Sequence, residues 1–395
     1  MEVSVRAGDT LSFLSKLFNI PLKLIEDSNL NVNPNKLKAG EKLHLPGYIS
    51  VPYVIKKGDT IWKIGAAKNV GADALLILNQ NMDAEQLKLG ETILLPERMI
   101  TPLTNIKTAY DNNSLLKELS RFKEVYPFIS VKPIGKSVLG NAIQEIRIGK
   151  GEKKVHMNAS FHANEWITTM VLMSLVDKYV RSLTNGTLIR GMKALKLYQD
   201  VELSVVPMVN PDGVDLVLNG PPLKLREDVI AINEGSDDFT HWKANIRGID
   251  LNNQFPANWD ICQKNKLPKS PAPRDFPGES PLTEPEARAM ADLAKTNSFD
   301  CLLAFHTQGE EFYWGYEGFE PQESETIAKE FERASGYEAI RYVNSHAGYK
   351  DWFIQEFKRP GFTLELGKGI NPLPLSQFQQ ILKAAEGIFI AALNC

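Results

Sequence analysis

The sequence predicts an α/β protein, in which a large domain built on a sheet with helices on both faces follows two small βααβ modules. Two observations predict this class. Residues 1–50 and 51–100 align without a gap at a constant offset of 50 residues, which indicates an internal repeat. After residue 106, apolar strand-like runs alternate with longer amphipathic segments. A length of 395 residues accommodates such a set of domains, at roughly 150 residues for an average domain.

The two repeats share turn and loop residues at matching positions. Gly8-Asp9-Thr10 returns as Gly58-Asp59-Thr60, and Asn29 and Asn31 return as Asn79 and Asn81. A short β-like run precedes each Gly-Asp-Thr turn, whose Asp or Thr side chain is suited to cap the helix that follows. A second short helix leads to an asparagine-rich loop and then to a return strand that ends in Leu-Pro. Each repeat therefore predicts the order β, α, α, β, over residues 1–48 and 49–98.

The large domain is expected over residues 106–395. Residues 98–105 contain Pro102 and no strong periodicity, which predicts a linker. A Pro- and Lys-rich stretch at 263–283 predicts a long loop at a functional rim. The regular elements that we expect are helices at 115–122 and 167–183 and strands at 143–148, 154–160, 201–206 and 301–305.

Composition excludes several classes of partner. The net charge of −3 gives no overall basic field for nucleic acid or for an anionic membrane. No apolar run approaches the roughly 20 residues that a membrane span needs, and the charged start of the chain has no apolar signal-peptide region, so we expect neither membrane insertion nor a signal peptide. Three scattered cysteines, Cys262, Cys301 and Cys395, form no disulfide framework. These features favour a cytoplasmic location.

Two histidines and one glutamate follow apolar strands and have the chemistry of metal ligands. His162 and Glu165 lie directly after one strand, and His306 directly follows another, Leu302 to Phe305. Two imidazoles and one carboxylate are the ligand set of a catalytic zinc that keeps a fourth position for water. Zinc lowers the pKa of that water to about 7. Glu365, an isolated acid within an apolar strand, is the candidate general base.

The repeated units resemble the LysM module, which binds N-acetylglucosamine-containing glycans such as peptidoglycan and chitin. In that family the sugar lies between the loop after the first strand and the loop before the second. The resemblance implies two weak binding grooves that gain affinity in tandem through effective concentration. The alternative is that these polar residues only build the turns. The residues placed near the sugar are Asp9, Thr10, Asn31, Asp59, Thr60 and Asn81.

The large domain resembles the zinc metallocarboxypeptidases, the carboxypeptidase A and T family, over essentially all of residues 106–395. The resemblance implies a mixed sheet flanked by helices and one Zn²⁺ per chain, bound by His162, Glu165 and His306, with Glu365 as general base. The segments that carry it, besides the two histidine segments, include Val209-Asn210-Pro211-Asp212-Gly213, Gly248-Ile249-Asp250-Leu251-Asn252, Asp351-Trp352 and Thr363-Leu364-Glu365-Leu366.

The chain departs from this family where the substrate is held. The family grips a free C-terminal carboxylate with an Asn-Arg pair, whereas this sequence has Asn252-Asn253 there. Loss of the bidentate arginine puts ordinary C-terminal exopeptidase action in doubt and leaves room for a chain that continues past the cleaved bond. Lys243 takes the place of the arginine that polarises the scissile carbonyl, so it is the expected oxyanion donor, with Arg247 as the alternative.

Two further residues are expected to contact the substrate. Lys350 aligns with the residue at the base of the family's specificity pocket, where a cation favours an anionic group. Tyr342 is adjacent to the position at which the family has its usual tyrosine.

Over its full length, the arrangement resembles the γ-D-glutamyl-L-diamino acid endopeptidases of spore-forming bacilli. The resemblance implies cleavage of the γ-D-glutamyl to diaminopimelate amide, with peptidoglycan stem peptides and glycan strands as partners, and an association with sporulation. One alternative is a zinc carboxypeptidase that releases acidic or diamino C-terminal residues, with Lys350 or Lys368 replacing the missing arginine. A wall-binding protein with an inert metal domain and a deacylase of small acyl amino acids are further alternatives. The oligomeric state stays open.

Overall fold

A computed structural model describes residues 1–104 and 108–395. These residues form two compact units. One contains Met1–Leu103, Leu119–Ser130 and Asp177–Leu195, and the other contains Thr104–Glu118, Val131–Val176 and Lys196–Cys395. The expected boundary between the linker and the large domain, at residues 105–106, lies outside the described residues.

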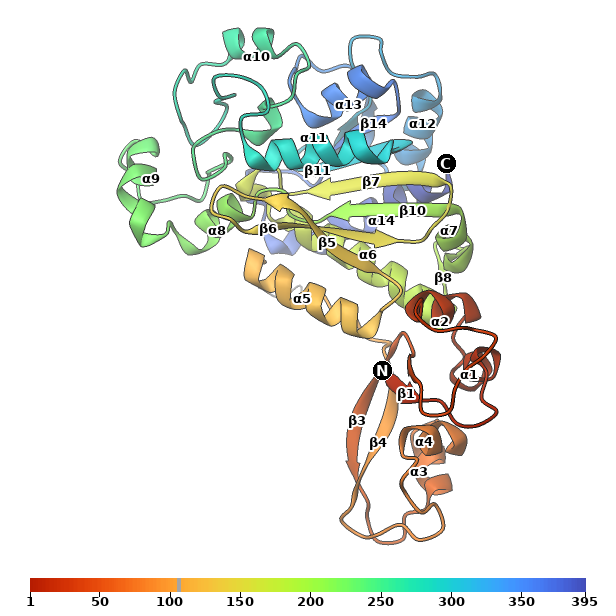
Figure 1. Ribbon diagram of the computed structural model, residues 1–395. Coiled ribbons are helices and arrows are strands. Elements are labelled where there is room, and N and C mark those ends of the chain that lie inside the picture. The colour runs from red at the N-terminus through yellow and green to blue at the C-terminus, as the bar shows by residue number, and fades with distance from the viewer. Residues whose placement is uncertain (105–107) are drawn as a thin grey trace. The chain divides into compact units, whose positions relative to one another are not determined.

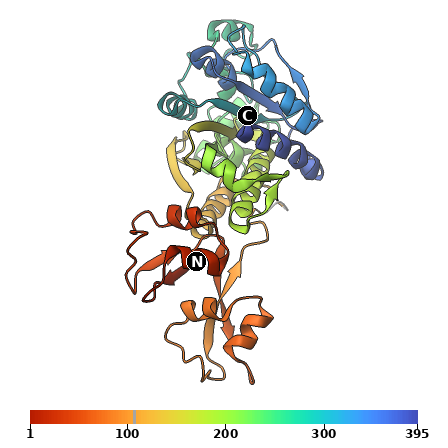
Figure 2. The same cartoon turned by 90° about the vertical axis from the view of Figure 1, so that its right-hand side faces the viewer.

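Both repeats have the predicted βααβ order (Figure 1). The strands pair antiparallel, with Val3 opposite Leu43 in the first module and Val51 opposite Leu95 in the second. Figure 2 shows the short helices of each module beside its strands. The first module contains β1 (Glu2–Ser4), α1 (Leu11–Phe18), α2 (Leu22–Ser28) and β2 (Lys42–His44). The second contains β3 (Tyr48–Val54), α3 (Ile61–Ala67), α4 (Ala72–Leu78) and β4 (Thr92–Arg98).

An eight-stranded mixed sheet forms the centre of the large domain, in the order β13-β12-β14-β11-β7-β10-β6-β5. The four strands β14, β11, β7 and β10 run parallel to one another, and β6 and β12 pair antiparallel with the two ends of that group. The strands are β5 (Ser130–Lys136), β6 (Ala142–Ile148), β7 (Lys153–Ala159), β10 (Val201–Val206), β11 (Cys301–His306), β12 (Glu311–Tyr313), β13 (Glu338–Ile340) and β14 (Gly361–Glu365).

Helices cover both faces of the sheet, as the sequence predicts (Figure 1). Leu302 and Ala304 of β11 pack with Met290 of α11 and Phe353 of α13 in one buried apolar cluster, and α14 lies on the opposite face. A short hairpin joins β8 (Leu188–Ile189) to β9 (Met192–Lys193). The helices are α5 (Asn112–Val125), α6 (Ile167–Asn185), α7 (Ala194–Asp200), α8 (Pro211–Asn219), α9 (Arg226–Ile232), α10 (Trp259–Asn265), α11 (Pro285–Asn297), α12 (Glu323–Ser335), α13 (Tyr349–Phe357) and α14 (Phe378–Asn394).

The predicted elements of this domain are present with small shifts at their ends. The strand expected at 201–206 spans Val201–Val206, and the helix expected at 167–183 extends to Asn185. The loop expected at 263–283 is shorter at its start, because α10 continues to Asn265. The parallel strands β7, β11 and β14 have their carboxyl ends on the same side of the sheet. The candidate ligands His162, Glu165 and His306 and the candidate base Glu365 lie at these strand ends.

Candidate metal centre

His162, Glu165 and His306 meet at the carboxyl ends of two neighbouring parallel strands. His162 follows β7 and precedes a single 3₁₀ turn, Ala163–Glu165, which places His162 and Glu165 three residues apart on one side of that turn. His306 is the last residue of β11. All three residues are buried, with exposed fractions of 6%, 1% and 2%. This edge of a parallel sheet is where open α/β folds bind their ligands.

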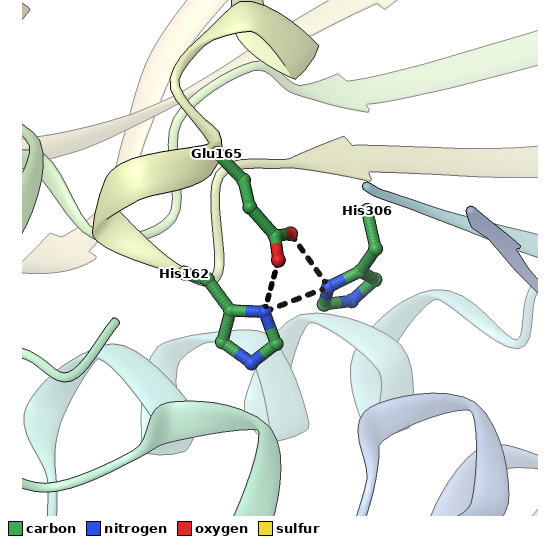
Figure 3. Close-up of side chains that lie close together, drawn as sticks. All are labelled: His162, Glu165 and His306. Atoms are coloured by element: carbon green, nitrogen blue, oxygen red, sulfur yellow. Dashed lines mark hydrogen bonds and ion pairs between the residues drawn. The ribbon is translucent and has the colours of Figure 1, made fainter. Parts of the chain in front are cut away.

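The facing atoms have the spacing of a tetrahedral metal site (Figure 3). His162 Nδ1 lies 2.9 Å from Glu165 Oε1, His306 Nδ1 lies 3.1 Å from Glu165 Oε2, and the two Nδ1 atoms are 3.2 Å apart. Ligands at about 2.0–2.1 Å from a tetrahedral zinc are separated by about 3.3 Å. The donor set and its spacing therefore fit zinc. Within residues 1–104 and 108–395, this is the group of His, Cys, Asp and Glu side chains able to hold a metal ion.

Asp250 orients His162 from the other side of its ring. Its Oδ1 lies 3.3 Å from His162 Nε2, so a proton on Nε2 leaves the Nδ1 lone pair directed toward Glu165 and His306. Burial lowers the pKa of His162, but the charges of Glu165 and Asp250 outweigh burial and raise the pKa to about 9. Burial raises the pKa of Asp250, and His162 and Lys243 more than reverse this effect and hold it below its usual range. The site thus favours positive charge.

Glu365 lies beside this group because of strand register. β11 and β14 are parallel, and their pairing sets His306 opposite Glu365 at the last position of each strand. Burial, followed by the charge of Glu165, raises the pKa of Glu365 to about 8, against the opposing charges of His162 and Lys243. A carboxyl group whose pKa is raised toward neutrality, next to a metal-ligand set, has the properties of a general base.

Lys243 contributes its positive charge to the same site, whereas Arg247 is paired with Glu284. The charge of Lys243 acts on His162, Asp250, His306 and Glu365. Its carbonyl oxygen accepts a hydrogen bond from the N–H of Ala163, which ties it to the 3₁₀ turn that carries Glu165. The Arg247 side chain is 55% exposed and pairs with Glu284 at 3.6 Å. This placement favours Lys243 of the two candidate oxyanion donors.

Asn252 and Asn253 make contacts within the chain. Asn252 Oδ1 accepts a hydrogen bond from the N–H of Tyr349 at 3.1 Å, which connects it to the start of α13. Asn253 is 7% exposed, and its Oδ1 accepts a hydrogen bond from the Cys262 thiol at 3.6 Å. Both residues lie two or three positions after Asp250, on the 3₁₀ turn Leu251–Asn253.

Lys350 and Tyr342 lie beside a cavity in the large domain. The Lys350 ammonium is buried, donates a hydrogen bond to the Gly315 carbonyl oxygen at 2.9 Å and pairs with Asp351 at 2.6 Å. Its positive charge is therefore matched within the chain. Tyr342 is half exposed and donates its hydroxyl hydrogen to Glu320. A cavity of about 410 Å³ is lined there by Gly315, Tyr316, Glu317, Gly318, Tyr342 and Val343.

The predicted glycan-contacting residues divide into two groups. Thr10 and Thr60 accept hydrogen bonds from the N–H groups of Phe13 and Lys63, and so cap α1 and α3 as the sequence predicts. Asp9 and Asp59 accept hydrogen bonds from the N–H groups of Arg6 and Lys56 within the turns. Asn31 and Asn81 are instead exposed on the loops that precede the return strands.

Comparison with known proteins assigns both parts of the chain. Residues 115–387 match the zinc carboxypeptidase family, and residues 3–46 and 53–96 match the LysM domain. The chain belongs to the zinc carboxypeptidase family. The resemblances to the LysM module and to the zinc metallocarboxypeptidases are therefore confirmed, together with the mixed sheet and the preceding LysM domains.

Individual relatives agree with this assignment. Gamma-D-glutamyl-L-diamino acid endopeptidase 1 of Lysinibacillus sphaericus is 50% identical over 395 residues, which cover 100% of both chains. The uncharacterised protein YqgT of Bacillus subtilis is 52% identical over 291 residues, 72% of this chain and 77% of that protein. Bovine thrombin-activatable fibrinolysis inhibitor, solved with a tick carboxypeptidase inhibitor, has a TM-score of 0.58 at 18% identity and covers 73% of this chain and 97% of that chain. It shares the fold.

Sequence reasoning about this zinc carboxypeptidase domain missed one part of the site. The sequence gives Asp250 no separate role within its segment. Its carboxylate accepts a hydrogen bond from the N–H of Asn252 at 3.1 Å and also contacts the ring of His162. The sequence does contain a signal for this contact. Metal-ligating histidines commonly bond a carboxylate through the second ring nitrogen, and Asp250 lies two and three residues before Asn252 and Asn253, where the family holds its substrate.

Proposed function

We propose that this protein binds one Zn²⁺ through His162, Glu165 and His306, and hydrolyses the γ-D-glutamyl to diaminopimelate amide in peptidoglycan stem peptides. The observation that carries the reaction class is the buried ligand group with Glu365 beside it. The substrate class is supported by the full-length similarity to an endopeptidase named for the γ-D-glutamyl-L-diamino acid bond. The LysM domains support a peptidoglycan substrate, because the sequence assigns them to glycan binding.

The chemistry follows from the residues around the ligand group. Bound zinc would supply Lewis acidity for the scissile carbonyl and positive charge that lowers the pKa of nearby groups. Glu365 takes a proton from the attacking water and returns it to the leaving amine. Lys243 places its ammonium group where negative charge develops on the carbonyl oxygen of the substrate. The reaction is hydrolysis of an amide bond, in which one water is consumed and an amine and a carboxylate are released.

The residues at the position where the family holds a terminal carboxylate leave room for a peptide chain that continues past the cleaved bond. Asn253 is a neutral residue that bonds Cys262, so it supplies no bidentate cation for a terminal carboxylate. Asn252 lies next to it on the same turn. We propose that the diamino acid residue is held near the cavity lined by Tyr342, with Lys350 beneath it at Gly315. A substrate carboxylate there would compete with Asp351 for the Lys350 ammonium.

The LysM domains are proposed to hold the protein on glycan strands through Asn31 and Asn81, with Asp9, Thr10, Asp59 and Thr60 shaping the loops of each groove. No described helix is long and apolar enough to cross a membrane. A role in sporulation and a location inside the cell or the developing spore belong to the same proposal, on the strength of the resemblance to the enzymes of spore-forming bacilli. Imaging of a fluorescent fusion through sporulation tests the location.

Mass spectrometry of reaction products tests the substrate. Zinc-loaded protein is incubated with L-Ala-γ-D-Glu-diaminopimelate and with the same peptide extended by D-Ala. The proposal predicts release of L-Ala-D-Glu from both peptides. Release of D-Ala alone from the extended peptide would support the alternative carboxypeptidase, in which Lys350 or Lys368 replaces the missing arginine. A matched pair of peptides with free and amidated C-termini separates the two activities, because only the carboxypeptidase requires the free carboxylate.

A further inference from the structure

The carboxylate of Glu165 receives a hydrogen bond on each oxygen from outside the ligand group. The backbone N–H of Thr307 donates to Oε2 at 3.3 Å, and the Asn371 side-chain amide donates from Nδ2 to Oε1 at 3.3 Å. Thr307 directly follows His306, whereas Asn371 is 206 residues away from Glu165 in sequence and lies beyond the end of β14. Asn371 has no role in the chemistry proposed above.

The orientation of the Asn371 amide is fixed by Thr307. The Thr307 hydroxyl donates to Asn371 Oδ1 at 2.7 Å, and Asn371 Nδ2 also donates to the Thr307 carbonyl oxygen at 3.2 Å. These two contacts distinguish the oxygen from the nitrogen of the amide and direct the N–H toward Glu165. The Asn371 carbonyl oxygen lies 2.8 Å from His241 Nδ1, which anchors the backbone at this point.

We infer that Asn371 is a positioning residue that holds the Glu165 carboxylate in the orientation needed for zinc, and so sets the zinc affinity of the site. This inference rests on the proposed zinc site. A carboxylate without fixed donors can rotate, and the ordering of a ligand on metal binding costs free energy. Partners that fix a ligand before the metal arrives remove part of that cost, and their loss typically weakens metal binding by roughly 10- to 100-fold.

The segment that carries Asn371 has other anchors, so removal of its side chain is not expected to unfold it. The N–H of Gly367 donates to the Tyr337 hydroxyl at 3.1 Å. Gln377 holds Lys368 on both sides, because its Oε1 accepts from the Lys368 N–H at 3.1 Å and its Nε2 donates to the Lys368 carbonyl oxygen at 2.7 Å. These bonds remain in an Asn371→Ala variant, which leaves the effect on Glu165 to be measured by itself.

The test is the zinc dissociation constant of the full-length protein, measured by competition with a chromophoric chelator. Asn371→Ala is expected to raise this constant by roughly 10- to 100-fold. Thr307→Val keeps the backbone donor to Glu165 but removes the hydroxyl that orients the amide, so it is expected to give a smaller rise in the same direction. Asn394→Ala, at an exposed position of the last turn of α14, is the matched control and should bind zinc like the parent.

An unchanged zinc dissociation constant in Asn371→Ala, with the circular dichroism of the parent, would overturn the inference. With an unchanged KM at saturating zinc, Asn371 would have no role in the site, and with a raised KM it would be a substrate contact instead. The visible spectrum of the cobalt-substituted protein provides a second readout, which should change in Asn371→Ala if the carboxylate moves. A parent protein that binds no zinc would refute the metal site itself, a failure distinct from either result.

Discussion

Glu365 is the single side chain on which the proposed hydrolysis depends most directly. It is opposite His306 in the register of β11 and β14, and burial raises its pKa to about 8. Glu365→Gln keeps the volume of the side chain and removes its basicity. We expect the variant to bind one zinc per chain and to lose roughly 10²- to 10⁴-fold in kcat, the usual contribution of a general base. Zinc analysis and steady-state kinetics check this, and near-parental kcat would refute the assignment.

The choice between Lys243 and Arg247 as oxyanion donor is settled by comparing two variants. Lys243 acts electrostatically on four titratable groups of the site, whereas Arg247 pairs with Glu284. Lys243→Met is therefore expected to lower kcat by roughly 10²- to 10³-fold with a smaller change in KM. Arg247→Met should leave kcat within a few-fold of the parent. The opposite ranking in kinetic assays would make Arg247 the donor.

At the residue scale, strand ends and residue types in the sequence predict His162, Glu165 and His306 as one ligand group, and the structure brings these three side chains together. The general-base role of Glu365 stays a prediction. The sequence does not predict the side chains that orient the ligands, because these contacts join distant segments. Asn371 is 206 residues away from Glu165, and nothing in its local sequence marks it as a neighbour of a metal ligand. Lys350 and Asp351 are adjacent in sequence, but only the structure shows that their side chains form an ion pair.

At the scale of elements, Glu286 at the start of α11 should make stability depend on pH. Its Oε1 accepts a hydrogen bond from the Val138 N–H at 2.9 Å, and burial raises its pKa from 4.5 to about 7. Below pH 4.5 the group is protonated in both states. Between pH 4.5 and about 7 only the folded state keeps the proton, so stability falls as pH rises, and the loss is complete above about pH 7.

Glu286→Gln removes this titration. At pH 8 the variant is expected to be more stable than the parent by roughly 2–4 kcal/mol, given about 1.4 kcal/mol per unit of pKa shift. At pH 4 the two proteins should unfold alike. Thermal unfolding at both pH values measures the difference, and Glu356→Gln, at an exposed position of α13, is the control. The same stability difference at pH 4 and pH 8 would show that Glu286 does not titrate as described.

Two asparagines of the second LysM domain separate folding from binding. Asn79 joins α4 to β4, because its Nδ2 donates to the carbonyl oxygens of Leu75 and Leu94 and its Oδ1 accepts from the Leu94 N–H, each at 2.8 Å. Asn81, two residues later, is exposed. Asn79→Ala is expected to destabilise the domain by roughly 1–3 kcal/mol through the lost hydrogen bonds. Asn81→Ala should leave thermal unfolding unchanged and weaken binding to chitin oligomers. A stability loss in Asn81→Ala would assign it to the fold instead.

The internal repeat allows the sequence to indicate which loop asparagines matter in the LysM domains. Asn29 forms the equivalent bonds in the first domain, to the carbonyl oxygens of Ile25 and His44 and from the His44 N–H. The two repeats therefore contain the same set of asparagine hydrogen bonds at an offset of 50 residues. The sequence showed that the Asn-x-Asn pattern mattered in both copies. It could not show which asparagine supports the fold, since both have the same side chain and differ only in the direction in which the loop presents them.

At the scale of the whole molecule, the two LysM domains are expected to act on hydrolysis only when the substrate is polymeric. Two weak sites on one chain bind a strand that carries many repeats more tightly than either alone, because the second contact is made at high effective concentration. Asn31→Ala and Asn81→Ala should each lower the rate on insoluble peptidoglycan, and the double variant should lower it by more than either single variant. All three should cleave the free stem peptide at the parental rate, since Glu365 and the metal ligands are untouched. Parallel assays on the two substrates decide the matter: an equal loss on both would mean that the substitutions damage the catalytic domain, and no loss on either would mean that these asparagines do not hold the glycan.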